Sequence, residues 1–183
     1  MWINPGIWPR ASRLNSHIIL IGMMGSGKTT VGRELSHLTQ LPFMDTDQAL
    51  EKQLGKTVAQ IFETEGEAAW RTYEATLCQS MREIPPHIIA TGGGIVLTPE
   101  NGRILREIGT VFWLQASLDT HLQRLALDTD RPLLPSQNKA EKLIALSKAR
   151  QPLYQACAHH IIQTDGLAPA QIATQILATQ KGS

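Results

Sequence analysis

The chain has 183 residues, of which 42% are hydrophobic, and this length and composition suit one domain with a buried core. Its formal net charge is +1, with 17 basic residues against 16 acidic ones and no long cationic block, which excludes a general electrostatic affinity for nucleic acid or for a membrane surface. No segment offers about eighteen uninterrupted apolar residues. We therefore expect a monomeric cytoplasmic protein that acts on small molecules, with neither nucleic acid nor membrane as a partner.

The amino-terminal residues and the two cysteines bear on domain organisation and compartment. Residues 1–16 lack the apolar run of a signal peptide, so we expect them to form a loose extension before a single domain at residues 17–180. Cys78 and Cys157 lie inside helical patterns and have no metal-ligand neighbours in the sequence. They predict reduced, packed thiols, which fits a reducing compartment.

The first predicted elements enclose a glycine-rich turn. HIILI at residues 17–21 predicts a buried strand, and GMMGSGKT at residues 22–29 matches G-x-x-x-x-G-K-[ST]. Residues 28–40 have the apolar spacing of a helix, with Val31, Leu35 and Leu38 on its buried face. Glycines let backbone N–H groups converge on an anion, and the following helix adds the positive end of its dipole. The plainer alternative is a glycine turn with an incidental lysine. The order strand, loop, helix favours a phosphate-binding loop, in which Lys28 reaches the β- and γ-phosphates of ATP and Thr29 ligates Mg²⁺. The expected nucleotide contacts in this loop are Gly25, Ser26, Gly27, Lys28, Thr29 and Thr30.

Beyond this loop, short strand-like runs alternate with helical patterns. Strands are expected within residues 41–47, 87–94, 110–115 and 159–164. Helices are expected at residues 45–55, after Gly66, from 99, at 118–127, after 138 and at 169–179. Another helix is expected from 57 toward 62, because Thr57 and Gln60 have capping-box spacing, and the helix after Gly66 carries Trp70, Tyr73 and Leu77 on one face. Repeated alternation of this kind predicts an α/β fold of three layers, with a central five-stranded parallel sheet between two helical layers.

The residues that follow each strand are candidates for the site, because ligands of parallel sheets bind at the carboxyl ends of the strands. Asp45 and Asp47 follow the second strand, and either could simply cap the next helix. The third strand ends in Ala90-Thr91-Gly92 and has no acidic residue there, so Asp45 is the candidate carboxylate for Mg²⁺, directly or through water. The glycines at residues 92–94 favour close approach of a ligand to the backbone over a plain turn.

Two arginines also stand out, although each has a simple structural explanation. Arg71 could form a surface ion pair with Glu74 or with Glu67 on the same helix. Arg150 could be a cation near a helix carboxyl terminus before Pro152. Two planar guanidinium groups on one acceptor would instead indicate an anionic acceptor such as a carboxylate.

Taken in order, the phosphate loop, DTD, EAAWRTYE, TGGG, DRPLL and ARQPLY resemble the shikimate kinase family, and the resemblance covers residues 17–180. It implies a P-loop fold of the nucleoside-monophosphate-kinase type, with substrate-binding helices at about residues 45–83 and a mobile lid at about residues 128–137. It further implies the ATP-dependent phosphorylation of shikimate to shikimate 3-phosphate, a step of aromatic amino acid biosynthesis, with Mg²⁺ as cofactor.

The resemblance also implies roles for single residues. Asp47 binds ring hydroxyls of shikimate and activates the attacking one, while Asp45 serves the Mg²⁺ shell. The shikimate carboxylate is held by Arg71 and Arg150, with the backbone of residues 92–94 beside the ring.

On the nucleotide side, the resemblance implies that Arg131 belongs to the lid and closes on the phosphates of ATP. Arg124, on the preceding helix, is implied to face the nucleotide. Lys28, Asp47 and Arg131 are thus the expected catalytic residues.

The sequence departs from the family pattern at two places, and other functions remain open. Trp70 stands where many members have phenylalanine, and no arginine near residues 159–166 is available to face adenine. A gluconate-type or nucleoside-monophosphate-type kinase would share the loop and the sheet. A nucleotide-binding regulatory module would leave Asp47 and Arg71 unexplained.

Overall fold

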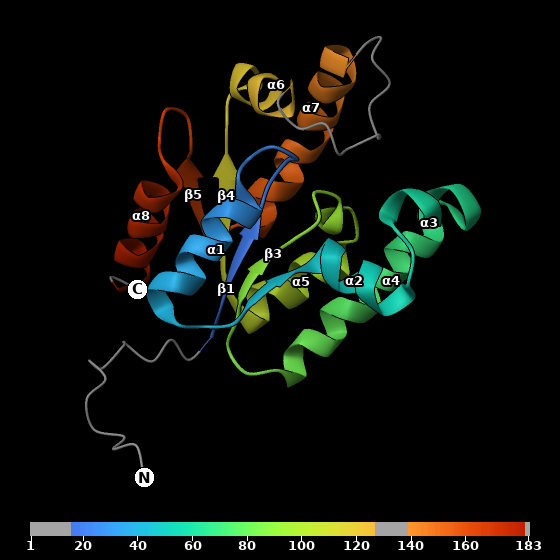
Figure 1. Cartoon of the computed structure of the whole chain (residues 1–183), viewed down its shortest axis with the longest axis horizontal. Coiled ribbons are helices and arrows are strands. Elements are labelled where there is room, and N and C mark those ends of the chain that lie inside the picture. The colour runs from blue at the N-terminus through green and yellow to red at the C-terminus, as the bar shows by residue number, and fades with distance from the viewer. Residues whose placement is uncertain (1–15, 127–138, 182–183) are drawn as a thin grey trace.

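The computed structural model describes residues 16–126 and 139–181, in which one parallel sheet lies between two helical layers (Figure 1). Its strands are β1 (His17–Ile21), β2 (Phe43–Asp45), β3 (Ile88–Ala90), β4 (Gly109–Gln115) and β5 (His160–Gln163). They are ordered β2-β3-β1-β4-β5, and every pair is parallel. The expected α/β fold with a five-stranded parallel sheet is confirmed.

The helices connect these strands and cover both faces of the sheet. They are α1 (Lys28–Thr39), α2 (Thr46–Leu54), α3 (Val58–Thr64), α4 (Gly66–Ser80), α5 (Pro99–Ile108), α6 (Leu118–Ala126), α7 (Lys139–Cys157) and α8 (Pro169–Lys181), with short 3₁₀ turns η1 (Met81–Glu83) and η2 (Ile95–Leu97). Helices α1 and α8 pack on one face, and α4, α5 and α7 pack on the other (Figure 1). None of the helices in the described ranges is long and apolar enough to cross a membrane.

The central strand β1 explains why both faces are covered. All five of its residues are buried, and alternate side chains of a strand point to opposite faces. Ile18 and Leu20 join the core under α1 and α8, whereas Ile19 and Ile21 join the core under α4, α5 and α7. A strand buried on both faces has no polar side to alternate with, which is typical of parallel sheets.

Local sequence signals set several helix ends where they were expected. The Asp45 side chain caps α2, and Gly55 ends that helix with φ at 66°. Thr57 and Gln60 form a reciprocal capping box at the start of α3. Trp70 packs with Tyr73 and Leu77 against α2 and α3 as the helical pattern of α4 predicted.

Three details differ from the sequence analysis or fall outside the description. Leu38, expected on the buried face of α1, has 48% of its surface exposed. Helix α7 does not end before Pro152 but continues through it to Cys157. The extension at residues 1–15, the predicted lid at residues 128–137 with Arg131, and Asn138 lie outside the described residues.

Candidate active site

The phosphate loop joins β1 to α1 and is shaped by glycines. Gly27, which precedes α1, has φ at 93°, a conformation that residues with a side chain rarely adopt. Gly22 has φ at 141°, and a Cβ there would lie 2.6 Å from the carbonyl oxygen of Leu114. Nζ of Lys28 donates to the carbonyl oxygens of Gly22 and Met23 at 2.9 and 2.8 Å. The ammonium group therefore lies over the loop, where the loop and the amino terminus of α1 together favour an anion.

The side chains of Thr29 and Asp45 are in contact. Thr29 follows Lys28 in the first turn of α1. Oγ1 of Thr29 donates to Oδ2 of Asp45 at 2.8 Å. Oδ1 of the same carboxylate accepts from the backbone N–H groups of Asp47 and Gln48, so Asp45 also caps α2. A hydroxyl beside one carboxylate fits Mg²⁺, which keeps several waters and takes few protein oxygens. Within the described ranges there is no cluster of three or more His, Cys, Asp or Glu side chains that could hold a metal alone.

Asp47 lies directly against Gly92, where β3 ends. A Cβ built on Gly92 would overlap the Asp47 carboxylate and lie 3.1 Å from Oε1 of Glu74. The Gly92 N–H donates to the buried Thr46 hydroxyl at 2.8 Å, which fixes the backbone beside that carboxylate. The absent side chain at Gly92 therefore makes room for Asp47 at the edge of the sheet.

Arg71 forms ion pairs on its own helix, as its simple structural explanation predicted. It also lies along the backbone of residues 92–94, which we call the glycine segment. Its guanidinium contacts Glu67 and Glu74, each at 2.6 Å, and the Glu74 side chain is only 1% exposed. Burial lowers the Arg71 pKa, yet the hydrogen bonds with these two carboxylates outweigh it and leave that pKa raised. A Cβ on Gly94 would lie 2.8 Å from Cζ of Arg71. Arg71 is therefore a fixed cation next to the backbone of Gly94.

Arg150 reaches the same segment from α7. Its Nη1 donates to the carbonyl oxygen of Gly93 at 3.2 Å. A Cβ on Gly93 would lie 3.5 Å from the carbonyl oxygen of Gly22 and 3.6 Å from the backbone nitrogen of Met24. The glycine segment therefore adjoins the phosphate loop, so the two groups of predicted residues form one continuous site.

Arg124 connects the phosphate loop to the end of β5. Its Nη1 donates to the carbonyl oxygen of Gly25 at 3.2 Å, and its Nη2 donates to that of Thr164 at 3.2 Å. The guanidinium also lies near Gly27, since a Cβ there would be 3.8 Å from Nη1. Arg124 thus borders the phosphate loop.

Comparison with known proteins agrees with this arrangement. A family model described as shikimate kinase matches residues 24–181. A shikimate kinase of Coxiella burnetii is 44% identical over 168 residues, which are 91% of this chain and 94% of the relative. The solved structure of a shikimate kinase from Acinetobacter baumannii in complex with shikimate has a TM-score of 0.87 at 38% identity, covering 92% of this chain and 94% of that one. The chain belongs to the shikimate kinase family. It is therefore an ATP-dependent kinase, and the reaction of its family is the phosphorylation of shikimate.

A further structural match bears on the alternative kinases. A gluconokinase from Sinorhizobium meliloti matches this chain with a TM-score of 0.58 at 15% identity. At that identity the likeness concerns the fold alone. The sheet that left a gluconate-type kinase open is thus a feature of the wider fold.

Sequence reasoning missed two residues that border the site, Tyr154 and Glu74. Oη of Tyr154 donates to the carbonyl oxygen of Gly93 at 2.5 Å, and burial raises the pKa of Tyr154 to about 12. Glu74 was considered only as a surface partner of Arg71, but burial raises the pKa of Glu74 and Arg71 opposes that rise. The available signals were the helical spacing of Tyr154 four residues after Arg150 and of Glu74 three residues after Arg71.

Proposed function

We propose that this chain transfers the γ-phosphoryl group of ATP to a hydroxyl group of shikimate, giving shikimate 3-phosphate and ADP, through the residues described above. The observation that carries this assignment is the convergence of Asp47, Arg71 and Arg150 on the backbone of residues 92–94, beside the phosphate loop. One carboxylate and two guanidinium groups suit an acceptor that has both hydroxyl groups and a carboxylate.

On the acceptor side, Arg71 and Arg150 bind the shikimate carboxylate. The Glu74 and Glu67 pairs hold the Arg71 guanidinium in one orientation, so less conformational freedom is lost when the acceptor binds. Asp47 accepts a hydrogen bond from the attacking hydroxyl and takes its proton as the new bond forms. A fixed acceptor next to the phosphate loop supplies the positioning on which phosphoryl transfer depends.

On the nucleotide side, Lys28 exchanges the loop carbonyls for the β- and γ-phosphate oxygens of ATP. Thr29 and Asp45 would hold Mg²⁺, which neutralises charge on the phosphates when it is bound. The hydrogen bond between their side chains supports this assignment, since it already brings both oxygens to one place. Arg124, beside the loop, adds a second fixed positive charge near the phosphates.

Three further features stay predictions of this proposal. Arg131 and a lid at about residues 128–137 are expected to close over the nucleotide and keep water from the γ-phosphate. The cytoplasm is the expected compartment, which the two free, buried thiols of Cys78 and Cys157 support. A monomer is the expected oligomeric state.

A coupled assay of ADP release tests the proposed function. We expect the purified protein, with ATP and Mg²⁺, to release ADP rapidly on addition of shikimate and slowly without it. Gluconate and a nucleoside monophosphate serve as comparison acceptors and should give no more than the rate without acceptor. Equal release with and without shikimate would contradict the proposal and favour a nucleotide-binding module. Faster release with gluconate would assign the site to another acid.

A further inference from the structure

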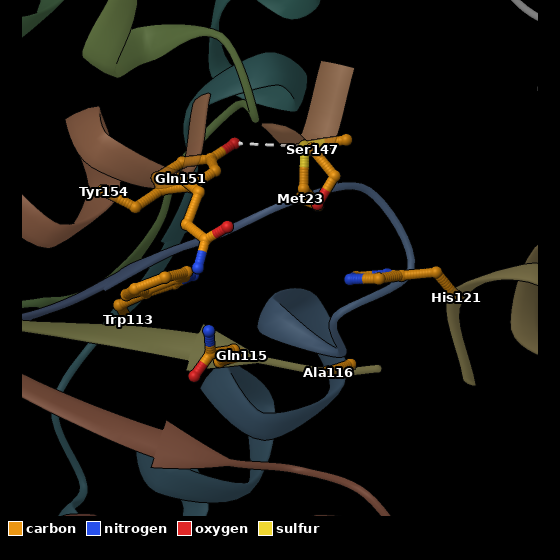
Figure 2. Close-up of a pocket in the computed structure, with 8 residues that line it drawn as sticks. All are labelled: Met23, Trp113, Gln115, Ala116, His121, Ser147, Gln151 and Tyr154. Carbon is orange, nitrogen blue, oxygen red and sulfur yellow. Dashed lines mark hydrogen bonds between the residues drawn. The ribbon is translucent and has the colours of Figure 1, made fainter. Parts of the chain in front are cut away.

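The hydroxyl group of Tyr154 lies where three segments of the site meet, although the proposed function gives this residue no role. Tyr154 extends from α7, and its Oη donates to the carbonyl oxygen of Gly93 at 2.5 Å. Sδ of Met23, in the phosphate loop, lies 3.6 Å from the same oxygen (Figure 2). Helix α7, the glycine segment and the phosphate loop therefore come together at one side-chain hydroxyl group.

Packing of the aromatic ring holds Tyr154 in the core. The residue is 1% exposed, and its ring stacks on that of Trp113 from β4, with the ring centroids 5.7 Å apart (Figure 2). Both rings belong to the core under α4, α5 and α7. Phenylalanine would keep this packing, so the contribution of the hydroxyl group can be removed on its own.

The Tyr154 hydroxyl group is a donor, and its proton goes to Gly93. Burial raises the pKa of Tyr154 to about 12, so the group keeps its proton at neutral pH. A hydroxyl group has one proton and a thioether sulfur is a weak acceptor, so the carbonyl oxygen is preferred over the sulfur of Met23. The hydroxyl group therefore acts on the glycine segment more than on the phosphate loop.

Arg150 donates to the same carbonyl oxygen. Its Nη1 lies 3.2 Å from the oxygen of Gly93, and Arg150 and Tyr154 share one face of α7 because they are four residues apart. A carbonyl oxygen has two lone pairs, whereas a guanidinium group has five N–H donors in a planar fork. With the Tyr154 hydroxyl group on one lone pair, the Gly93 carbonyl has one lone pair left for the arginine.

The number of N–H groups that Arg150 gives to the backbone matters, because the proposed function requires them for the acceptor. A guanidinium group binds a carboxylate best through two parallel N–H···O bonds. A Gly93 carbonyl with both lone pairs open would draw a second N–H group of Arg150 and turn the fork toward the backbone. The geometry of the fork toward the acceptor would then be lost.

We propose that Tyr154 is a positioning residue of the acceptor site: its hydroxyl group occupies the Gly93 carbonyl, so that Arg150 gives this oxygen a single N–H and presents its other N–H groups to the acceptor carboxylate. This inference rests on the proposed function, because that function assigns the acceptor carboxylate to Arg150. Tyr154 acts through Arg150 and the glycine segment, without contact to either substrate. It therefore affects the acceptor and leaves the nucleotide nearly unchanged.

The test compares Tyr154→Phe in the wild-type protein with Tyr154→Phe in an Arg150→Ala background. In the wild-type protein we expect the KM for shikimate to rise about three- to tenfold, as for loss of one ordinary hydrogen bond. The kcat and the KM for ATP should stay within about twofold. In the Arg150→Ala background, the same substitution should change the KM for shikimate by less than about twofold, because the side chain that Tyr154 positions is already absent.

The matched control is Tyr73→Phe, which alters the other tyrosine of the chain. The Tyr73 hydroxyl group donates to Glu65 at 2.6 Å at an exposed position, so its removal should leave all three constants near their wild-type values. An increase in the KM for shikimate by the same factor in both Arg150 backgrounds would overturn the inference. So would an equal rise in the KM for ATP, since either result would indicate a general structural role of Tyr154.

Failure of the inference and failure of the proposed function give different results. A wild-type protein that releases no ADP in response to shikimate would refute the proposed function, and the inference with it. A wild-type protein that phosphorylates shikimate, together with a Tyr154→Phe variant whose KM for shikimate is unchanged, would refute the inference alone.

Discussion

The side chains of Thr29 and Asp45 share a hydrogen bond of 2.8 Å, which joins the first turn of α1 to the end of β2. Asp45 uses its other oxygen to cap α2, so one carboxylate caps a helix and, in the proposed function, also serves Mg²⁺. A single substitution can remove one role and keep the other, because asparagine caps helices about as well as aspartate but has no charge.

Asp45→Asn is therefore expected to raise the Mg²⁺ concentration needed for half-maximal activity by about tenfold, as for loss of one charge-assisted contact. The melting temperature should change little, since the cap on α2 remains. Titration of activity with Mg²⁺ at saturating ATP measures the effect. A wild-type Mg²⁺ requirement in this variant would remove Asp45 from the metal site.

Gly94→Ala should damage acceptor binding by displacing Arg71. The backbone of Gly94 has φ at −98°, which alanine can adopt, but the added Cβ would overlap the Arg71 guanidinium. We expect a higher KM for shikimate and an unchanged KM for ATP. Gly102→Ala is the matched control: its Cβ would meet Sγ of Cys157 at an ordinary 3.7 Å, and alanine favours the helix. Equal kinetics in the two variants would contradict the placement of Arg71.

Arg71→Ala removes a charge-assisted contact to the acceptor carboxylate, which is worth about 1.5–3 kcal/mol. The KM for shikimate should rise about ten- to a hundredfold, and the KM for ATP should barely change. Since this variant also leaves Glu74 buried without its cation, its thermal stability should fall. Steady-state kinetics on the folded variant give the answer. A selective rise in the KM for ATP would assign Arg71 to the other substrate.

Asp47→Asn keeps the volume of the side chain but removes its basicity. General-base catalysis contributes about 10²–10⁴ in rate, so turnover should fall by that order. Shikimate affinity should also fall through weaker hydroxyl contacts, whereas affinity for an ATP analogue should not. Equilibrium titrations with each ligand separate these effects. Wild-type affinity for shikimate would exclude Asp47 from the acceptor pocket.

The cysteines should be unreactive in the native protein. Burial raises the pKa of Cys78 to about 12 and that of Cys157 to about 11, from a usual value of 9.0. Little thiolate therefore exists at pH 8, and the thiolate is the reactive form. We expect Ellman's reagent to label neither residue until the protein is unfolded, when both react. Rapid labelling of the native protein would contradict the buried positions of these side chains.

Sequence reasoning succeeded where the signal was local. The phosphate loop, the cap at Asp45 and the capping box at Thr57 each depend on residues within a few positions of one another, so spacing alone identified them. The five strands followed from short apolar runs between turn residues.

Sequence reasoning failed where packing between distant segments decides the local structure. Tyr154 meets the carbonyl of Gly93, which lies 61 positions earlier, and no local pattern marks that pair. Pro152 normally ends or kinks a helix, but Leu153, Tyr154 and Cys157 pack against the core, and this burial keeps the last turns of α7 helical.

The contacts of α7 with Gly93 also bear on when the site can be completed during translation. Arg150 and Tyr154 reach that carbonyl across 57 and 61 positions of chain. A nascent chain that has emerged from the ribosome only up to the residue before Arg150 already contains the phosphate loop, Asp47 and Arg71. It still lacks Arg150 and Tyr154. Such a chain cannot complete the proposed acceptor contacts, and it also lacks β5 and α8, whose residues Ile162, Ile172 and Ile176 pack with α1 in the core beside the phosphate loop.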